Sequence, residues 1–119
     1  MASILFVDDD TQTLILAKLF MEKEGFIVHG CGDTQKARKV LEKNKIDLII
    51  TDVGLPGENG LQFYDWLQTQ EAYKNIPVLF VSAHAVGFDE HLTKHRDRFI
   101  AKPLFFPDLI SRLKKELNL

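Results

Sequence analysis

Five polar residues in this sequence stand at the ends of short apolar runs, where a charge or a hydroxyl needs an explanation. Asp8 and Asp9 follow one run, Asp52 follows another, and Ser82 and Lys102 close two more. Three carboxylates at one place repel each other, and a hard cation such as Mg²⁺ relieves that repulsion. One carboxylate could then attack a phosphoryl group, while the ammonium and the hydroxyl stabilise charge on the phosphoryl oxygens. The residue types therefore predict magnesium-dependent phosphoryl chemistry.

Each of these residues also has a simpler structural explanation. An aspartate before a helix can cap it and interact favourably with its dipole, but one is sufficient, and Asp10 can fill that role. Asp52 could be only a turn former before Gly54, Ser82 only a strand-end cap, and Lys102 only a solvated surface residue. All of these explanations would have to hold at once, at matching positions. A shared site is the better interpretation.

Short apolar runs alternate with longer amphipathic stretches along the chain. The runs are rich in Ile, Val and Phe, which indicates strands, and they cover residues 3–7, 26–31, 47–51, 76–82 and 98–102. Helices are predicted over Thr11 to Glu24, after a cap at Asp33 or Thr34, around Leu61 to Leu67, after Ser82, and around Leu109 to Leu117. Five alternations imply a parallel sheet with helices on both faces. The carboxyl ends of such strands line one crevice, which would bring the five polar residues together.

Two of the predicted helices carry more specific expectations. In the first, the polar residues Thr11, Lys18 and Glu22 form one stripe and apolar residues cover the rest, which predicts a largely buried helix. The last helix begins with Phe105 and Phe106 in place of a capping Ser or Asp, and a proline sets its first turn.

Length and composition indicate one domain over residues 1–119. Apolar residues make up 45% and charged residues 27%, as in an ordinary soluble globule. The net charge is −2 with no basic block, which argues against direct contact with nucleic acid. The single cysteine, Cys31, excludes an internal disulfide and favours the cytoplasm. We find neither a signal peptide nor a window long and apolar enough to span a membrane.

Four motifs in this order and spacing resemble the receiver domain of two-component response regulators: "ILFVDDD", "DLIITDVGLPGENG", "VLFVSA" and "FIAKP". The similarity runs from about Ser3 to Leu117. It implies an α/β, flavodoxin-like, doubly wound fold, with a five-stranded parallel sheet in the order 2-1-3-4-5 and five helices on both faces. It also implies a signalling domain that is not an enzyme in the usual sense.

The resemblance implies a role for each polar residue. Asp52 matches the phosphoacceptor, and Asp8 and Asp9 match the acidic pair that holds Mg²⁺. The backbone carbonyl of Gly54 matches a further metal contact. Lys102 matches the lysine that pairs with the phosphate, and the proline after it often follows a cis peptide in the family. The phosphoryl group would come from a histidine kinase or a histidine phosphotransfer protein.

The resemblance also implies a switch and an output. Ser82 matches the hydroxyl that follows the phosphoryl group, and Phe99 occupies the place of a rotating aromatic residue. We expect the surface of the fourth helix, fifth strand and fifth helix to bind a partner protein, an output domain or a second copy of the chain. Three consecutive large apolar residues, which a helix start is not expected to bury completely, mark that surface: Leu104, Phe105 and Phe106.

Some features leave other interpretations open. An aspartyl phosphohydrolase of the haloacid-dehalogenase type also uses a strand-end aspartate, but Gln12 occupies a place where that family has Thr or Val. A receiver-like interaction domain that no longer accepts phosphate is a third possibility. His91 and His95 share the spacing of some zinc ligands, without a third ligand. Gly54 is small for its position and, with His84, flanks the phosphoryl pocket, while the predicted fourth helix is short.

Overall fold

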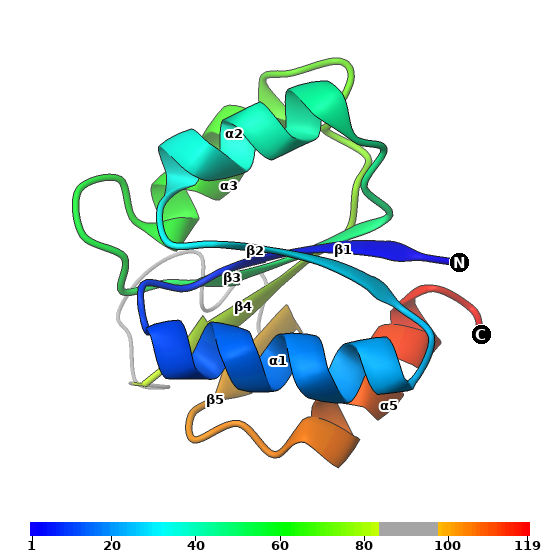
Figure 1. Cartoon of the computed structure of the whole chain (residues 1–119). Coiled ribbons are helices and arrows are strands. Elements are labelled where there is room, and N and C mark those ends of the chain that lie inside the picture. Colours follow the sequence, from blue (N-terminus) through cyan, green and yellow to red (C-terminus); the bar gives the residue numbers. More distant parts are fainter. Residues whose placement is uncertain (84–97) are drawn as a thin grey trace.

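A five-stranded parallel sheet forms the centre of the molecule in the computed structural model, which describes residues 1–83 and 98–119 (Figure 1). The strands are β1 (Ser3–Val7), β2 (Ile27–Cys31), β3 (Leu48–Asp52), β4 (Val78–Ser82) and β5 (Phe99–Ala101). All five strands predicted from the apolar runs are confirmed. β3 and β4 are buried along their whole length, which explains why their sequences are apolar without alternation.

The strand order is β2-β1-β3-β4-β5, so the flavodoxin-like topology is confirmed. In the register of β1 with β3, Val7 lies beside Thr51, and in that of β4 with β5, Ser82 lies beside Ala101. The chain therefore leaves β1 and β3 at the same level of the sheet. Residues that follow Val7 and Thr51 meet at this edge, as the sequence predicts.

Four helices lie within residues 1–83 and 98–119: α1 (Thr11–Lys23), α2 (Thr34–Lys43), α3 (Gly60–Gln68) and α5 (Phe106–Glu116). Asp10 caps α1 and Asp33 caps α2 through their side chains, as predicted, and Asn59 forms a capping box with Gln62 at α3. The fourth helix predicted after Ser82 falls outside the described residues. Among the described helices, none combines the length and hydropathy that a membrane span requires.

Two hydrophobic clusters cover the two faces of the sheet, because successive strand residues point to opposite faces. Ile4, Phe6 and Ile50 face α1 and α5, while Leu5 and Ile49 face α2 and α3. Figure 1 shows these two helix pairs on opposite sides of the sheet. The central strands β1, β3 and β4 are buried on both faces apart from the half-buried Ser3, so the strand ends that carry the three carboxylates and Ser82 are held rigidly.

The prediction that α1 is largely buried is wrong. Only Ala17 and Met21 are buried, while Ile15, Leu16, Leu19 and Phe20 remain 41–61% exposed. With 100° between successive residues, Ala17 and Met21 share one narrow stripe that faces the sheet, with the half-buried Leu14 beside it. Ile15, Leu16 and Leu19 lie well to the side of this stripe. The number of apolar residues in α1 therefore does not show how much of the helix is buried.

The predicted contact surface at residues 104–106 also needs correction. Phe106 is buried and stacks on Phe20, with their ring centroids 5.0 Å apart, and Leu104 is half-buried against the same core. Phe105 alone of the three is exposed. It occupies the N-cap position of α5 without a side-chain capping bond, in agreement with the missing Ser or Asp. Burying Phe106 in the first turn fills the gap between α1 and α5.

Candidate functional site

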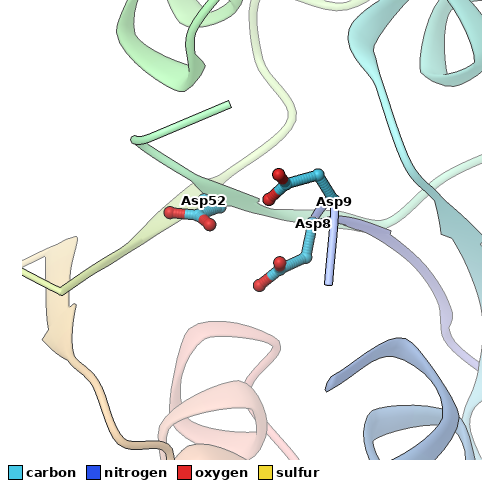
Figure 2. Close-up of side chains that lie close together, drawn as sticks. All are labelled: Asp8, Asp9 and Asp52. Atoms are coloured by element: carbon cyan, nitrogen blue, oxygen red, sulfur yellow. The ribbon is translucent and has the colours of Figure 1, made fainter. Parts of the chain in front are cut away.

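Three carboxylates meet at the carboxyl edge of the sheet (Figure 2). Asp8 and Asp9 directly follow β1, and Asp52 is the last residue of β3. One oxygen from each lies within 4.8 Å of the oxygens of the other two. Asp8 and Asp52 are buried, whereas Asp9 is exposed at the mouth of the group. The structure thus brings together the acidic residues that the sequence singles out.

Lys102 joins this group from the end of β5. Its Nζ lies 2.9 Å from Oδ2 of Asp52 and 3.1 Å from Oδ2 of Asp8. Its backbone N–H donates to the carbonyl of Ser82, and its peptide bond to Pro103 is cis. Burial lowers the pKa of Lys102, but the hydrogen bond to Asp52 and the ionic contacts with Asp52 and Asp8 outweigh burial and leave that pKa raised. The ammonium is therefore charged at neutral pH and faces both buried carboxylates.

One of the two carboxylate oxygens of Asp8 is not fully hydrogen-bonded. Its Oδ1 accepts a hydrogen bond from the backbone N–H of Asp10 at 2.9 Å. Its buried Oδ2 faces Lys102 but receives no well-aligned hydrogen bond within residues 1–83 and 98–119. Burial, the largest cause, raises the pKa of Asp8. An incompletely satisfied buried carboxylate oxygen beside two more carboxylates is a donor set that suits a hard divalent cation.

Two glycines let the backbone turn tightly after Asp52. The N–H of Gly54 donates to Oδ1 of Asp52 at 3.0 Å, and that of Gly60 donates to the carbonyl of Val53 at 3.1 Å. A Cβ at Gly60 would overlap the backbone carbonyl oxygen of Asp52, so only glycine fits there. A Cβ at Gly54 would sit 3.8 Å from Oδ1 of Asp52, so this position leaves the carboxylate open on that side.

Ser82 and Phe99 lie on the neighbouring strands β4 and β5, as predicted. Ser82 is buried at the site edge of β4. Phe99 is half-buried and stacks on Phe80, with a centroid distance of 4.9 Å. His84, His91 and His95 lie outside the described residues.

One ion pair on the loop that follows Asp52 is not predicted by any pattern in the sequence. Arg38 of α2 pairs with Glu58, which belongs to the loop between Asp52 and α3. Twenty residues separate the two, and neither belongs to a periodic pattern that would connect them. Only the packing of α2 beside α3 brings them together.

A sequence model of the response regulator receiver domain matches residues 4–114, nearly the whole chain. The chain belongs to the response regulator receiver family. It is the receiver domain of a two-component response regulator, and the haloacid-dehalogenase interpretation is not favoured. Receiver domains typically bind Mg²⁺ at an acidic cluster, and this chain has an acidic group formed by Asp8, Asp9 and Asp52.

Curated relatives and solved structures agree with this membership. The receiver is 30% identical to the regulatory protein VanR of Enterococcus faecium, with 97% of this chain and 49% of VanR covered. It is 27% identical to the polar-differentiation response regulator DivK of Brucella anthropi, with 98% and 96% covered. A response regulator from Desulfuromonas acetoxidans is 28% identical and superposes with a TM-score of 0.86 over 99% of this chain and 98% of that one. The chain thus spans about half the length of VanR and nearly all of DivK.

Proposed function

We propose that Asp52 is the phosphoacceptor of this receiver and that Asp8, Asp9, Asp52 and the carbonyl of Gly54 hold Mg²⁺. The observation that carries the proposal is the position of Lys102, whose Nζ lies within 3.1 Å of both Asp8 and Asp52. One cation between two buried carboxylates leaves excess negative charge, to which Asp9 adds. A divalent ion offsets that excess, and the incompletely satisfied Oδ2 of Asp8 supplies a ligand for it.

The reaction is a transfer of one phosphoryl group. A carboxylate oxygen of Asp52 attacks the phosphorus of a phosphohistidine, a P–O bond forms, the P–N bond breaks, and the imidazole leaves with that electron pair. Lys102 and the hydroxyl of Ser82 stabilise the charge on the phosphoryl oxygens. When bound, Mg²⁺ supplies positive charge that lowers the repulsion between Asp52 and the incoming group. The product is an aspartyl phosphate.

The donor in this proposal is a histidine kinase or a histidine phosphotransfer protein in the cytoplasm, and residues 1–119 act as one receiver unit. Once Asp52 is modified, the hydroxyl of Ser82 turns toward the phosphoryl group. Phe99 then leaves its stack on Phe80 and moves into the space that is freed. This change alters the surface around β5 and α5, to which a partner, an output domain or a second copy of the chain binds.

Phosphorylation by acetyl phosphate tests the site directly. We expect intact-mass spectrometry to show one phosphoryl group on the wild type with Mg²⁺ and none after chelation or in Asp52→Asn. A variant that still gained the label would place the phosphoacceptor elsewhere. For the switch, the amides of Ser82 and Phe99 should shift on addition of beryllofluoride. Unchanged amides in a demonstrably modified protein would exclude the proposed coupling, and sedimentation of the same samples tests self-association.

A further inference from the structure

Arg38 is held between an aromatic ring and a carboxylate. Its Nη2 donates to both oxygens of Glu58, at 2.8 and 2.7 Å, and its Cζ lies 4.2 Å from the centroid of the Trp66 ring. The three residues come from α2, the loop after β3, and α3. A planar guanidinium can stack on a ring and pair with a carboxylate at its edge at the same time, which an ammonium cannot do. We call this arrangement the Arg38 latch.

The latch secures the loop that connects Asp52 to α3. At its start, the N–H of Val53 donates to the carbonyl of Val81 at 2.9 Å, and Leu55 is buried in the α2 and α3 core. Beyond Leu55 comes Gly57, with a φ of +73°. Glycine at a left-handed position has wide conformational freedom, so this stretch needs a second anchor to have one defined position. Glu58, fixed by Arg38, is that anchor.

The latch also keeps the Glu58 carboxylate apart from the acidic group. Both oxygens of Glu58 are engaged by Arg38, and Glu58 is not one of the carboxylates that converge with Asp52. Without Arg38, Glu58 would lose its partner and the loop beyond Gly57 would lose this anchor. Pairing with Arg38 therefore keeps the loop in one position.

We infer that Arg38 and Glu58 are positioning residues for the metal site: the latch fixes the loop so that the carbonyl of Gly54 is held toward the position of the ion. This inference rests on the proposed function, because Gly54 is a ligand only if Asp52 and its neighbours bind Mg²⁺. The N–H of Gly54 bonded to Asp52 fixes one end of the loop, and Glu58 fixes the other. Neither positioning residue touches the reacting atoms.

The same contacts make Trp66 a reporter of the loop. It is the only tryptophan in the chain, so its emission can be assigned without ambiguity. A cation 4.2 Å from its ring affects that emission, so loss of the Arg38 contact should change it. Trp66 emission therefore reports whether the latch forms in solution, although Trp66 lies on α3 and not beside Asp52.

Calorimetry with Mg²⁺ on the full chain tests the inference. We expect Glu58→Gln and Arg38→Met to weaken Mg²⁺ binding by roughly tenfold, the double variant to be no weaker than either single one, and Arg38→Lys to recover part of the loss. The matched control is Glu71→Gln, which removes the exposed ion pair with Lys74 and should leave Mg²⁺ affinity unchanged. In parallel, Trp66 emission should differ between the wild type and Arg38→Met, because the substitution removes the cation over the ring.

The possible outcomes separate this inference from the proposed function. If the wild type binds Mg²⁺ and the folded latch variants bind it equally well, the latch is only structural and the inference is wrong. This conclusion holds even if urea denaturation shows that the variants are less stable. If Glu58→Gln and Arg38→Met do not fold, the comparison rests on Arg38→Lys, whose ammonium cannot stack on Trp66 and pair with Glu58 at once. A Mg²⁺ affinity of Arg38→Lys equal to that of the wild type then overturns the inference. If the wild type itself binds no Mg²⁺, both proposals fall.

Discussion

The two sides of the sheet bury their inner residues equally well but differ in their outer layer. On the α2 and α3 side, Trp66 packs between Phe63 and Tyr73, and Arg38 lies over its ring. On the α1 and α5 side, the outer surface of α1 exposes large apolar residues, and Phe105 is exposed beside α5. Figure 1 shows the two helix pairs on opposite faces of one sheet. Contacts on the first side tie the loop after Asp52 to α2 and α3, and we call it the braced side; on the second, Phe20 of α1 stacks on Phe106 of α5.

The difference between the two sides indicates which part of the backbone near the site must be rigid. The loop that follows Asp52 enters α3, so contacts on the α2 and α3 side fix the backbone next to the site. The loop from Lys102 enters α5 and is held by the ion pairs of Lys102, by the half-buried Leu104 and by the buried ring of Phe106. A cavity of about 390 Å³, lined in part by Leu16, Lys102 and Phe106, separates α1 from that loop. Substitutions on the two sides should therefore have unequal effects.

The largest effect is expected at the centre of the braced side. Phe63 is fully buried, and Phe63→Ala should lower the free energy of unfolding by about 3–5 kcal/mol, because it removes apolar contacts and leaves a cavity. Urea denaturation followed by circular dichroism measures it. A loss below about 1 kcal/mol would show that this side repacks easily and is not braced.

Gly60→Ala should have the next largest effect. The added methyl overlaps the carbonyl of Asp52 and must push the start of α3 away from β3, at a cost of about 1–3 kcal/mol. Acetyl phosphate labelling should slow as well, because the end of β3 moves. Gly32→Ala is the control, since a Cβ there meets nothing within 4 Å. Equal behaviour of the two variants would show that the loop adapts without disturbing the site.

Asp8→Asn tests the acidic group, which lies at the carboxyl edge of the sheet between its two faces. The pKa of Asp8 is raised in the folded protein, chiefly by burial, so the folded state binds this proton more tightly than the unfolded chain. As the pH rises from the ordinary aspartate pKa through the raised pKa, ionisation of Asp8 therefore lowers the free energy of unfolding. This loss of stability is still present at neutral pH. Asparagine cannot ionise, so the variant should be more stable at pH 7 and bind Mg²⁺ more weakly. Urea midpoints from pH 3 to pH 8 would contradict this if the variant were the less stable protein at pH 7.

The smallest effect is expected on the outer surface of α1. Leu19 is 60% exposed, and Leu19→Gln should change the free energy of unfolding by no more than about 0.5 kcal/mol. The same urea assay applies, with Met21→Gln as the buried counterpart on the same helix. If Leu19→Gln cost about 2 kcal/mol, α1 would be buried in solution, and the contrast between the two sides would disappear.

The strand ends could be predicted because their signal is local. An apolar run followed by a polar residue predicts where a strand ends and which polar side chain lies at that end. In a parallel sheet all of these ends lie at the same edge, so no further information is needed to bring them together. Asp8, Asp52 and Lys102 meet for that reason. The cap at Asp10 is equally local, since its side chain accepts from the N–H of Gln12.

What could not be predicted depends on tertiary packing. Composition shows that α1 is rich in apolar residues, but the stripe that faces the sheet depends on how the helix is rotated, and Leu19 lies off that stripe. Phe105 and Phe106 are adjacent and chemically identical, yet only the second reaches Phe20. The Arg38 latch joins residues from three elements, and no spacing rule connects them.

The central position of β1 and β3 has a consequence for hydrogen exchange. Both strands have partners on two sides, and the hydrogen bonds of the sheet continue past their ends, from Asp8 to Cys31 and from Val53 to Val81. Amides in such positions exchange with deuterium only when the whole molecule opens, whereas those of helix ends exchange through local fraying. We therefore expect the Asp8 and Val53 amides to report the full free energy of unfolding. The acidic site would then be lost and regained together with the whole fold.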